Sequence, residues 1–290
     1  MDLDPLHRLS RDLVRAAATM SPQEARYLVD AYYQHQEHRK RAANQVRAAG
    51  AEPHATLEWL NSQEDMLEAQ IKRALDGYAA DHPVMIWMRS LYGIGPVISA
   101  GVMAHIDIRK APTAGHIWRF AGLDPTSKWN KGEPPPWNAN LKVLCWKIGQ
   151  SFMKFSGQEE CFYGHLYLQR KVYEIARNDS GGNAARAAAK QANFAANSPA
   201  KKYIADGKLP PFMIDAQARR WAVKIFLAHL QQIWWWCDTG KPPPLPFALT
   251  IPTHVHFIPP PGDLPAGFDP YQFVDDPAVS RDPSRYVQPS

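Results

Sequence analysis

One long helical run constrains the fold more than any other part of the sequence. Ser21-Pro22-Gln23-Glu24 forms a capping box with proline at the first helical position, a typical start of a helix. The helical pattern continues from there to Gly50, a residue that commonly ends helices. The sequence therefore predicts one long helix that begins after Ser21 and ends at Gly50.

A second helix is predicted after the loop around Pro53. Its apolar residues recur at helical spacing and are Leu57, Leu60, Met66, Leu67, Ile71 and Leu75. The two helices are expected to form an antiparallel hairpin. Their polar faces carry many charges and their apolar stripes are narrow, which favours a coiled-coil-like projection that could also join two copies of the chain. A buried helical pair is the alternative.

The rest of the chain predicts a mainly α fold in three parts. Helical spacing continues at 84–91, 96–105, 112–123, 139–154, 159–178 and 214–237, and the best strand candidate is 247–258. We expect N-terminal helices with the helical hairpin at 1–82, a helical domain at 83–237 with an insertion around 178–210, and an acidic, proline-rich tail at 238–290. Trp234, Trp235 and Trp236 are expected to anchor that tail, or to form a patch that binds a partner.

Several classes of protein are disfavoured by composition. The N-terminal residues lack the basic start and apolar run of a signal peptide, and the most apolar helix is broken by polar residues, so we expect a soluble, cytoplasmic protein without a membrane contact. Cys145, Cys161 and Cys237 are widely spaced, which argues against a disulfide framework and a zinc knuckle. His254 and His256 have strand spacing but no third ligand nearby, so neither a metal nor a cofactor is predicted.

The charge of the chain favours an anionic partner. The net charge is +5, and residues 262–290 carry five aspartates against two arginines, so the remaining chain is more basic than the total indicates. A basic body favours a polyanion, and nucleic acid is the commonest one in a cytoplasm. A solvated basic surface without a partner is the alternative.

A glycine-rich turn separates the two short helices at 84–91 and 96–105. Gly93-Ile94-Gly95-Pro96 has the pattern of a helix-hairpin-helix, in which glycine permits a turn that a Cβ atom would obstruct. Pro96 suits the first position of the second helix. The amides of Gly95, Val97 and Ile98 would then face outward at a helix N-terminus, where a phosphate of the DNA backbone can bind without its sequence being read.

Three stretches in this order resemble a known family. LYGIGPVISAGVMAHIDI (91–108), IWRFAGLDP (117–125) and WNANLKVLCWKIGQSF (137–152) look like the C-terminal domain of the IS-one-ten, IS-one-sixteen and IS-nine-oh-two group of insertion-sequence transposases. The matching positions are Gly93, Ile94, Gly95, Pro96, Phe120, Ala121, Gly122, Leu123, Pro125, Asn138, Leu141 and Lys142. With the helical hairpin, which resembles the connector of those enzymes, the similarity covers about half of the chain. It implies DNA binding and a role in transposition or recombination.

The sequence also departs from that family. Family members begin with a RuvC-like domain whose four acidic residues bind magnesium, and no such pattern precedes the hairpin here. The family's catalytic serine follows the A-G-L-x-P element beside a glycine. Ser127 is the nearest candidate, but it lies closer to Pro125 and has no neighbouring glycine. The resemblance thus implies a DNA-binding protein whose nuclease is supplied in trans, or a diverged enzyme that uses Ser127.

Lysines and tryptophans alternate after the hairpin. Lys128, Lys131 and Lys142 lie among Trp129, Trp137 and Trp146, a combination that suits a phosphate-binding groove with stacking surfaces. For Trp146 we expect a core position instead. The leading hypothesis is a protein that binds duplex or branched DNA and is associated with the nucleoid. The alternatives are a serine-dependent transposase or recombinase active on its own, and a scaffold whose helical hairpin and tail bind other proteins.

Overall fold

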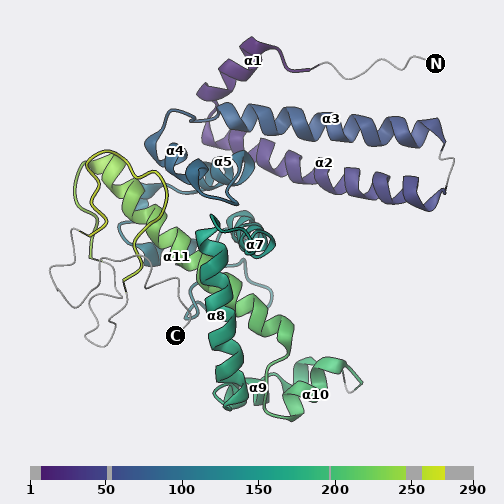
Figure 1. Cartoon of the computed structure of the whole chain (residues 1–290), viewed down its shortest axis with the longest axis vertical. Coiled ribbons are helices and arrows are strands. Elements are labelled where there is room, and N and C mark those ends of the chain that lie inside the picture. Colours follow the sequence, from purple (N-terminus) through teal and green to yellow (C-terminus); the bar gives the residue numbers. More distant parts are fainter. Residues whose placement is uncertain (1–7, 51–53, 196, 246–256, 272–290) are drawn as a thin grey trace. The chain divides into compact units, whose positions relative to one another are not determined.

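The structure, a computed structural model, describes residues 8–50, 54–195, 197–245 and 257–271 (Figure 1). Every regular element within these ranges is helical, which confirms the mainly α fold. None of the helices in them is long and apolar enough to cross a membrane. The strand candidate at 247–258 lies outside the described residues except for its last two, and His254 and His256 lie outside them as well.

The chain divides into two compact units. Unit 1 comprises the described residues up to Ser90 together with Ile94–Asp107, and unit 2 comprises Leu91–Gly93 and the described residues from Ile108 onward. From the sequence, the boundary between the N-terminal helices and the helical domain was predicted after residue 82. In the structure the two short helices α4 (Pro83–Ser90) and α5 (Pro96–His105) cluster with the N-terminal helices instead.

Unit 1 is built on two long helices, α2 (Pro22–Ala48) and α3 (Ala55–Gly77), which lie side by side (Figure 1). The capping box forms as predicted, because the Ser21 hydroxyl accepts from the Glu24 amide at 3.3 Å and the Glu24 carboxylate accepts from the Ser21 amide at 2.7 Å. The short helix α1 (Arg11–Ala16) and the 3₁₀ turn η1 (Ala17–Thr19) precede them and pack on α3.

Only the base of this helical hairpin lies in the core of unit 1. The buried residues of α2 are Ala25 and Val29, and those of α3 are Ala74 and Leu75, all at the end where α5 packs. There the Arg26 guanidinium donates to the Ala104 carbonyl at 3.0 Å. Beyond that base the two helices contact mainly each other, as a projecting pair would.

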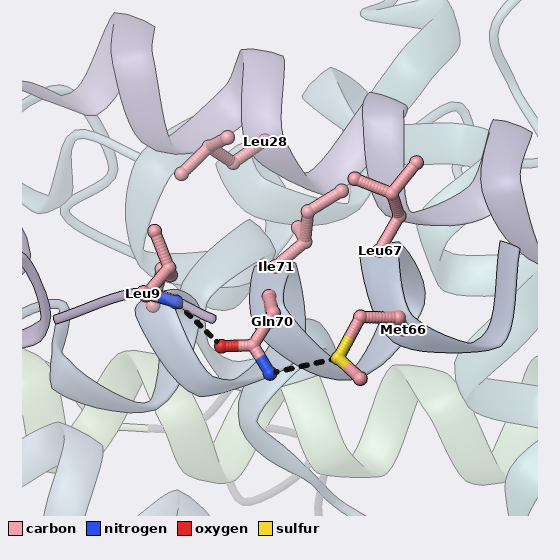
Figure 2. A pocket seen from close by; sticks show the side chains of 7 residues that line it. Leu9, Leu28, Met66, Leu67, Gln70 and Ile71 are labelled. Atoms are coloured by element: carbon pink, nitrogen blue, oxygen red, sulfur yellow. Dashed lines mark hydrogen bonds between the residues drawn. The ribbon is translucent and has the colours of Figure 1, made fainter. Parts of the chain in front are cut away.

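An apolar cavity of about 230 Å³ lies between α2, α3 and the segment before α1 (Figure 2). Gln70 is the polar residue in its wall. The Gln70 carbonyl oxygen accepts from the Leu9 amide at 3.0 Å, and its amide nitrogen lies 3.6 Å from the Met66 sulfur. Since both halves of this side chain already have partners, the cavity offers packing space and no reactive group.

Unit 2 is organised around its last helix, α11 (Pro211–Thr239), which packs against α6 (Ala114–Phe120), α7 (Ala139–Lys154) and α8 (Phe162–Asp179). Figure 1 shows α11 running alongside α8. Aromatic rings fill the centre: Phe152 stacks on Tyr163 with centroids 4.9 Å apart, and Phe226 meets both rings edge-on at 5.9 and 5.5 Å. The 3₁₀ turn η2 (Ile108–Lys110) leads into this unit.

A buried histidine fastens the tail segment 257–271 to α11. His229 Nε2 lies 2.8 Å from the Ile258 carbonyl, which can only accept, so Nε2 carries the hydrogen and Nδ1 accepts from the Tyr163 hydroxyl at 2.7 Å. Complete burial lowers the pKa of His229 to about 4. Farther along, Trp236 meets the buried ring of Phe268 at 6.1 Å, so an aromatic contact secures this stretch of the tail.

The segment expected to be an insertion, 178–210, has a small core of its own. It contains α9 (Ala184–Ala188), the 3₁₀ turn η3 (Gln191–Asn193) and α10 (Pro199–Ala205). Its buried apolar residues are Ala187, Ile204 and Leu209, with Phe194 against them, and Met213 and Ile214 of α11 complete the cluster. Asn178 closes the segment, because its side chain exchanges two hydrogen bonds with the Leu209 backbone at 2.9 and 3.1 Å.

Candidate nucleic-acid interface

The glycine-rich turn needs a glycine at one position only. Gly93 has φ +91°, a backbone conformation that other residues rarely adopt, and a Cβ atom there would lie 3.4 Å from the Ser151 hydroxyl. That hydroxyl donates to the Gly93 carbonyl at 2.6 Å, which ties the first half of the turn to α7. Gly95 is extended, with φ −98° and ψ 179°, and a Cβ atom there would meet nothing within 4 Å. The expectation that Gly95 is needed for the turn geometry is therefore wrong.

Gly95 is the N-cap of α5, and no side chain of the described residues caps this helix. Among the described residues, no acceptor lies within hydrogen-bonding distance of the amides of Gly95, Val97 and Ile98. Gly95 is exposed, whereas Ile94 and Val97 bury their side chains. The backbone donors predicted for a phosphate are thus unpaired, which is the arrangement a bound anion requires.

The turn has little positive charge of its own. Arg89 is the single lysine or arginine between Pro83 and His105, and it pairs with the Asp76 carboxylate. Within this stretch, therefore, an anion at the start of α5 would be held by backbone dipoles.

The loop between α6 and α7 is closed at its base by Asn138. The Asn138 amide donates to the Phe120 carbonyl at 2.9 Å, and its side-chain oxygen accepts from the Leu141 amide at 2.8 Å to cap α7. Gly122 ends α6 with φ +65°, and a Cβ atom there would lie 2.8 Å from the Trp137 ring. The glycine of the A-G-L-x-P element is needed for both its conformation and its close approach.

Ser127 lies in this loop, and none of the described residues serves as a catalytic partner for it. Its amide donates to the Asp124 carbonyl at 3.3 Å, while the Asp124 carboxylate accepts from the Thr126 amide and hydroxyl at 2.9 and 2.8 Å. No histidine, lysine or carboxylate of the described chain hydrogen-bonds to the Ser127 hydroxyl. Nothing in this arrangement activates the hydroxyl as a nucleophile.

The three lysines predicted to bind DNA differ in their surroundings. Lys128 and Lys131 are exposed in the loop, and neither forms an ion pair with a described residue. Lys142 lies on α7 with its ammonium 3.7 Å from the centre of the Trp137 ring. Trp137 in turn meets Trp129 at 6.2 Å, so the loop carries a small aromatic cluster beside Lys142.

Lys142 also lines a cavity of about 180 Å³ between this loop, α7 and α11. Two residues that the sequence analysis did not single out, Arg219 and Arg220, line it with Lys142, and its wall contains no carboxylate. We call these three residues the cationic pocket. Arg219 and Arg220 are the one pair of adjacent arginines in α11. Two charges next to each other in a helix that is otherwise rich in apolar residues are the sequence signal that could have indicated this site.

The charges of the cationic pocket are only partly compensated. Arg219 Nε lies 2.8 Å from the Asp215 carboxylate, but neither Lys142 nor Arg220 pairs with a carboxylate of the described chain. Partial loss of water and the nearby charges of Arg186 and Arg219 lower the pKa of Arg220. Partial burial and the charge of Arg220 lower the pKa of Lys142. The mutual repulsion of these cations would be relieved by an anion in the cavity.

Trp146 corrects a prediction. A core position was expected for it, but its side chain is 55% exposed and it borders the cationic pocket. The residues of α7 that pack inward are Leu141, Leu144, Cys145, Ile148 and Phe152. Trp146 is not among them, and its exposed ring at the edge of the cavity, next to cations, can stack on a base or a sugar.

No protein-family model, curated protein or solved structure gives a significant match to this chain.

Proposed function

We propose that the protein binds DNA through its backbone phosphates and serves in DNA transposition or recombination. The cationic pocket carries this proposal, because neither Lys142 nor Arg220 has a carboxylate partner among the described residues. Partial burial and neighbouring cations lower the pKa of both side chains. A phosphate has the charge and the size to enter such a cavity, and arginine can bind two of its oxygens at once. The exposed Trp146 ring and the exposed Lys128 and Lys131 extend the same surface.

The unpaired amides at the start of α5 provide a second phosphate contact in this proposal. Contacts of both kinds fix the position of a duplex and read no sequence, so the affinity would depend on salt more than on sequence. The role in transposition rests on the resemblance of three ordered stretches to the insertion-sequence enzymes. A separate metal-dependent nuclease would then cleave the strands, since no activating partner of Ser127 lies in the described part of the chain.

The reversal of one charge in the cationic pocket tests the proposal. We expect Arg220→Glu to weaken binding to a labelled mixed-sequence duplex by roughly 10-fold or more, since a hydrogen bond to a charged group contributes about 1.5–3 kcal/mol. Fluorescence anisotropy over a salt series would measure it, with single-stranded and four-way DNA as further probes. The logarithmic slope of affinity against salt should fall in magnitude by about 1.

Arg47→Glu is the matched control for that variant. Arg47 is exposed near the end of α2, forms no ion pair with a described residue and gives the same change of net charge. We expect it to weaken binding only slightly. Equal losses in the two variants, or wild-type binding that does not weaken with rising salt, would contradict the proposal. Cleavage or a covalent DNA adduct that disappears in Ser127→Ala would favour the enzyme alternative, and absence of any DNA binding would favour the scaffold.

A capping residue at Gly95 tests the second contact. An aspartate there can accept from the amides of the first turn of α5 and would occupy the donors intended for a phosphate. Because the position is extended and open, we expect Gly95→Asp to leave the unfolding temperature unchanged or raise it while DNA affinity falls several-fold. Gly95→Ala, which leaves those amides free, should bind nearly as well as the wild type. Unchanged affinity in Gly95→Asp would exclude the turn from the interface.

A further inference from the structure

Two histidines and a glutamate meet between the long helices of unit 1, well away in sequence from the residues discussed so far. His35 and His38 lie on α2, and Glu64 lies on α3. One atom from each of these side chains lies within 4.8 Å of the other two. His35 Nδ1 is 2.7 Å from one carboxylate oxygen of Glu64, and His38 Nδ1 is 3.6 Å from the other.

Helical spacing explains why the three side chains converge. Residues three apart on a helix are neighbours on one face, so His35 and His38 both project toward α3. The Glu64 side chain is only 14% exposed, whereas that of His38 is 56% exposed. The carboxylate is therefore held between the helices, and solvent can reach the group from the side of His38.

Ordinary ion pairing accounts for only part of this arrangement. One imidazole hydrogen bond, from His35, satisfies one oxygen of Glu64, and His38 at 3.6 Å is beyond hydrogen-bonding range. The neighbouring cations are engaged elsewhere: Arg39 contacts Glu68 at 2.6 Å and Asp65 at 3.2 Å. The second imidazole thus faces the carboxylate without a direct bond to it.

We propose that His35, His38 and Glu64 bind a zinc ion. Two imidazole nitrogens and one carboxylate oxygen form a donor set that Zn²⁺ prefers, with water at the fourth position. Zinc bonds of about 2.0–2.1 Å place tetrahedral ligand atoms roughly 3.3 Å apart. The distances of 2.7 and 3.6 Å run to different oxygens of Glu64, and one donor atom from each of the three residues lies within 4.8 Å of the other two. Rotation of the side chains can bring these three atoms to the spacing that one ion requires. Mg²⁺ and Ca²⁺ prefer oxygen ligands and do not suit it.

Zinc at this position would link α2 to α3 beyond the buried base of the helical hairpin. No residue of α2 after Val29 and none of α3 before Ala74 is buried, so this stretch lies outside the core of unit 1. Because the ion binds the paired helices and not the unfolded chain, its binding free energy adds to the stability of the hairpin. This site is independent of the proposed DNA contacts.

The experiment uses the full chain without an affinity tag, treated with a chelator and then dialysed. Calorimetric titration with Zn²⁺ should show about one strong site, and Zn²⁺ should raise the helical melting temperature followed by circular dichroism. His35→Ala and Glu64→Gln should each weaken Zn²⁺ binding at least 10-fold and abolish the rise, whereas Mg²⁺ should have no effect on any of the proteins. The readout is the change caused by metal, because both substitutions also remove the bond between His35 and Glu64.

Two controls separate this site from other histidines. His116 is exposed on α6 and hydrogen-bonds to Thr113, and His254 and His256 form the histidine pair of the tail sequence. We expect His116→Ala and the double variant His254→Ala/His256→Ala to bind Zn²⁺ as the wild type does. Wild-type Zn²⁺ affinity in both His35→Ala and Glu64→Gln, or no strong binding to the wild type, would overturn the proposal.

Discussion

Replacement of Phe226 by alanine is expected to lower the free energy of unfolding of unit 2 by about 3–5 kcal/mol. Phe226 is completely buried on α11 and contacts the rings of Phe152 and Tyr163, so its removal leaves a cavity where α7, α8 and α11 meet. Urea denaturation followed by tryptophan fluorescence would measure the loss. This signal reports mainly unit 2, because all the tryptophans except Trp59 and Trp87 lie there.

Phe212→Ala is the control on the same helix. The Phe212 side chain is 57% exposed, and its ring meets that of Phe194 edge-on at 6.3 Å. We expect a loss below about 1 kcal/mol, as for most substitutions at the surface. If the two variants lost similar stability, the aromatic centre described for unit 2 would be wrong.

His229 is expected to make unit 2 lose stability as the pH falls below neutral. Its pKa is about 4 in the folded protein and about 6.5 in the unfolded chain, so the unfolded chain binds more protons between these values. Its stabilising effect is complete above pH 6.5 and decreases steadily toward pH 4. The difference between the two pKa values corresponds to about 3 kcal/mol by pH 4. Urea denaturation at intervals from pH 7 to pH 4 would measure the decrease.

The variant His229→Gln isolates this effect from other titrating groups. Glutamine can retain one of the two hydrogen bonds of His229 and does not titrate. We expect it to be less stable than the wild type at pH 7, and the difference should shrink by about 3 kcal/mol as the pH approaches 4. His105, whose pKa burial lowers to about 4, and the carboxylates remain in both proteins. A constant difference across this range would show that His229 is not buried in its neutral form.

The helices and their starts could be predicted from the sequence because their signals are local. Ser21 and Glu24 cap α2 three residues apart, and Asn138 caps α7 through the Leu141 amide, so each contact lies within a short window. The turn at Gly93 could be predicted for the same reason, since its positive φ is a property of one residue. The mainly α fold follows from such local signals.

The groupings of side chains could not be predicted, because they join distant parts of the chain. Lys142 meets Arg220 only after α7 and α11 pack together, and His35 meets Glu64 only across the helical hairpin. Trp146 was predicted in the core because apolar residues of α7 surround it in sequence. Which side chains of α7 are buried depends on how this helix packs against α11, and Trp146 is not among them. The domain boundary differed because the packing of α5 on α2 and α3 leaves no mark in composition.

The confinement of buried residues to the base of the hairpin has a consequence for its length. A helix pair held in the core at one end only can gain or lose paired turns at the other end without any change in the packed residues. Each added turn extends the pair by about 5.4 Å. Related chains could therefore differ in the reach of this arm while they keep the same body, and a partner at its tip would be held at a distance set by the number of turns.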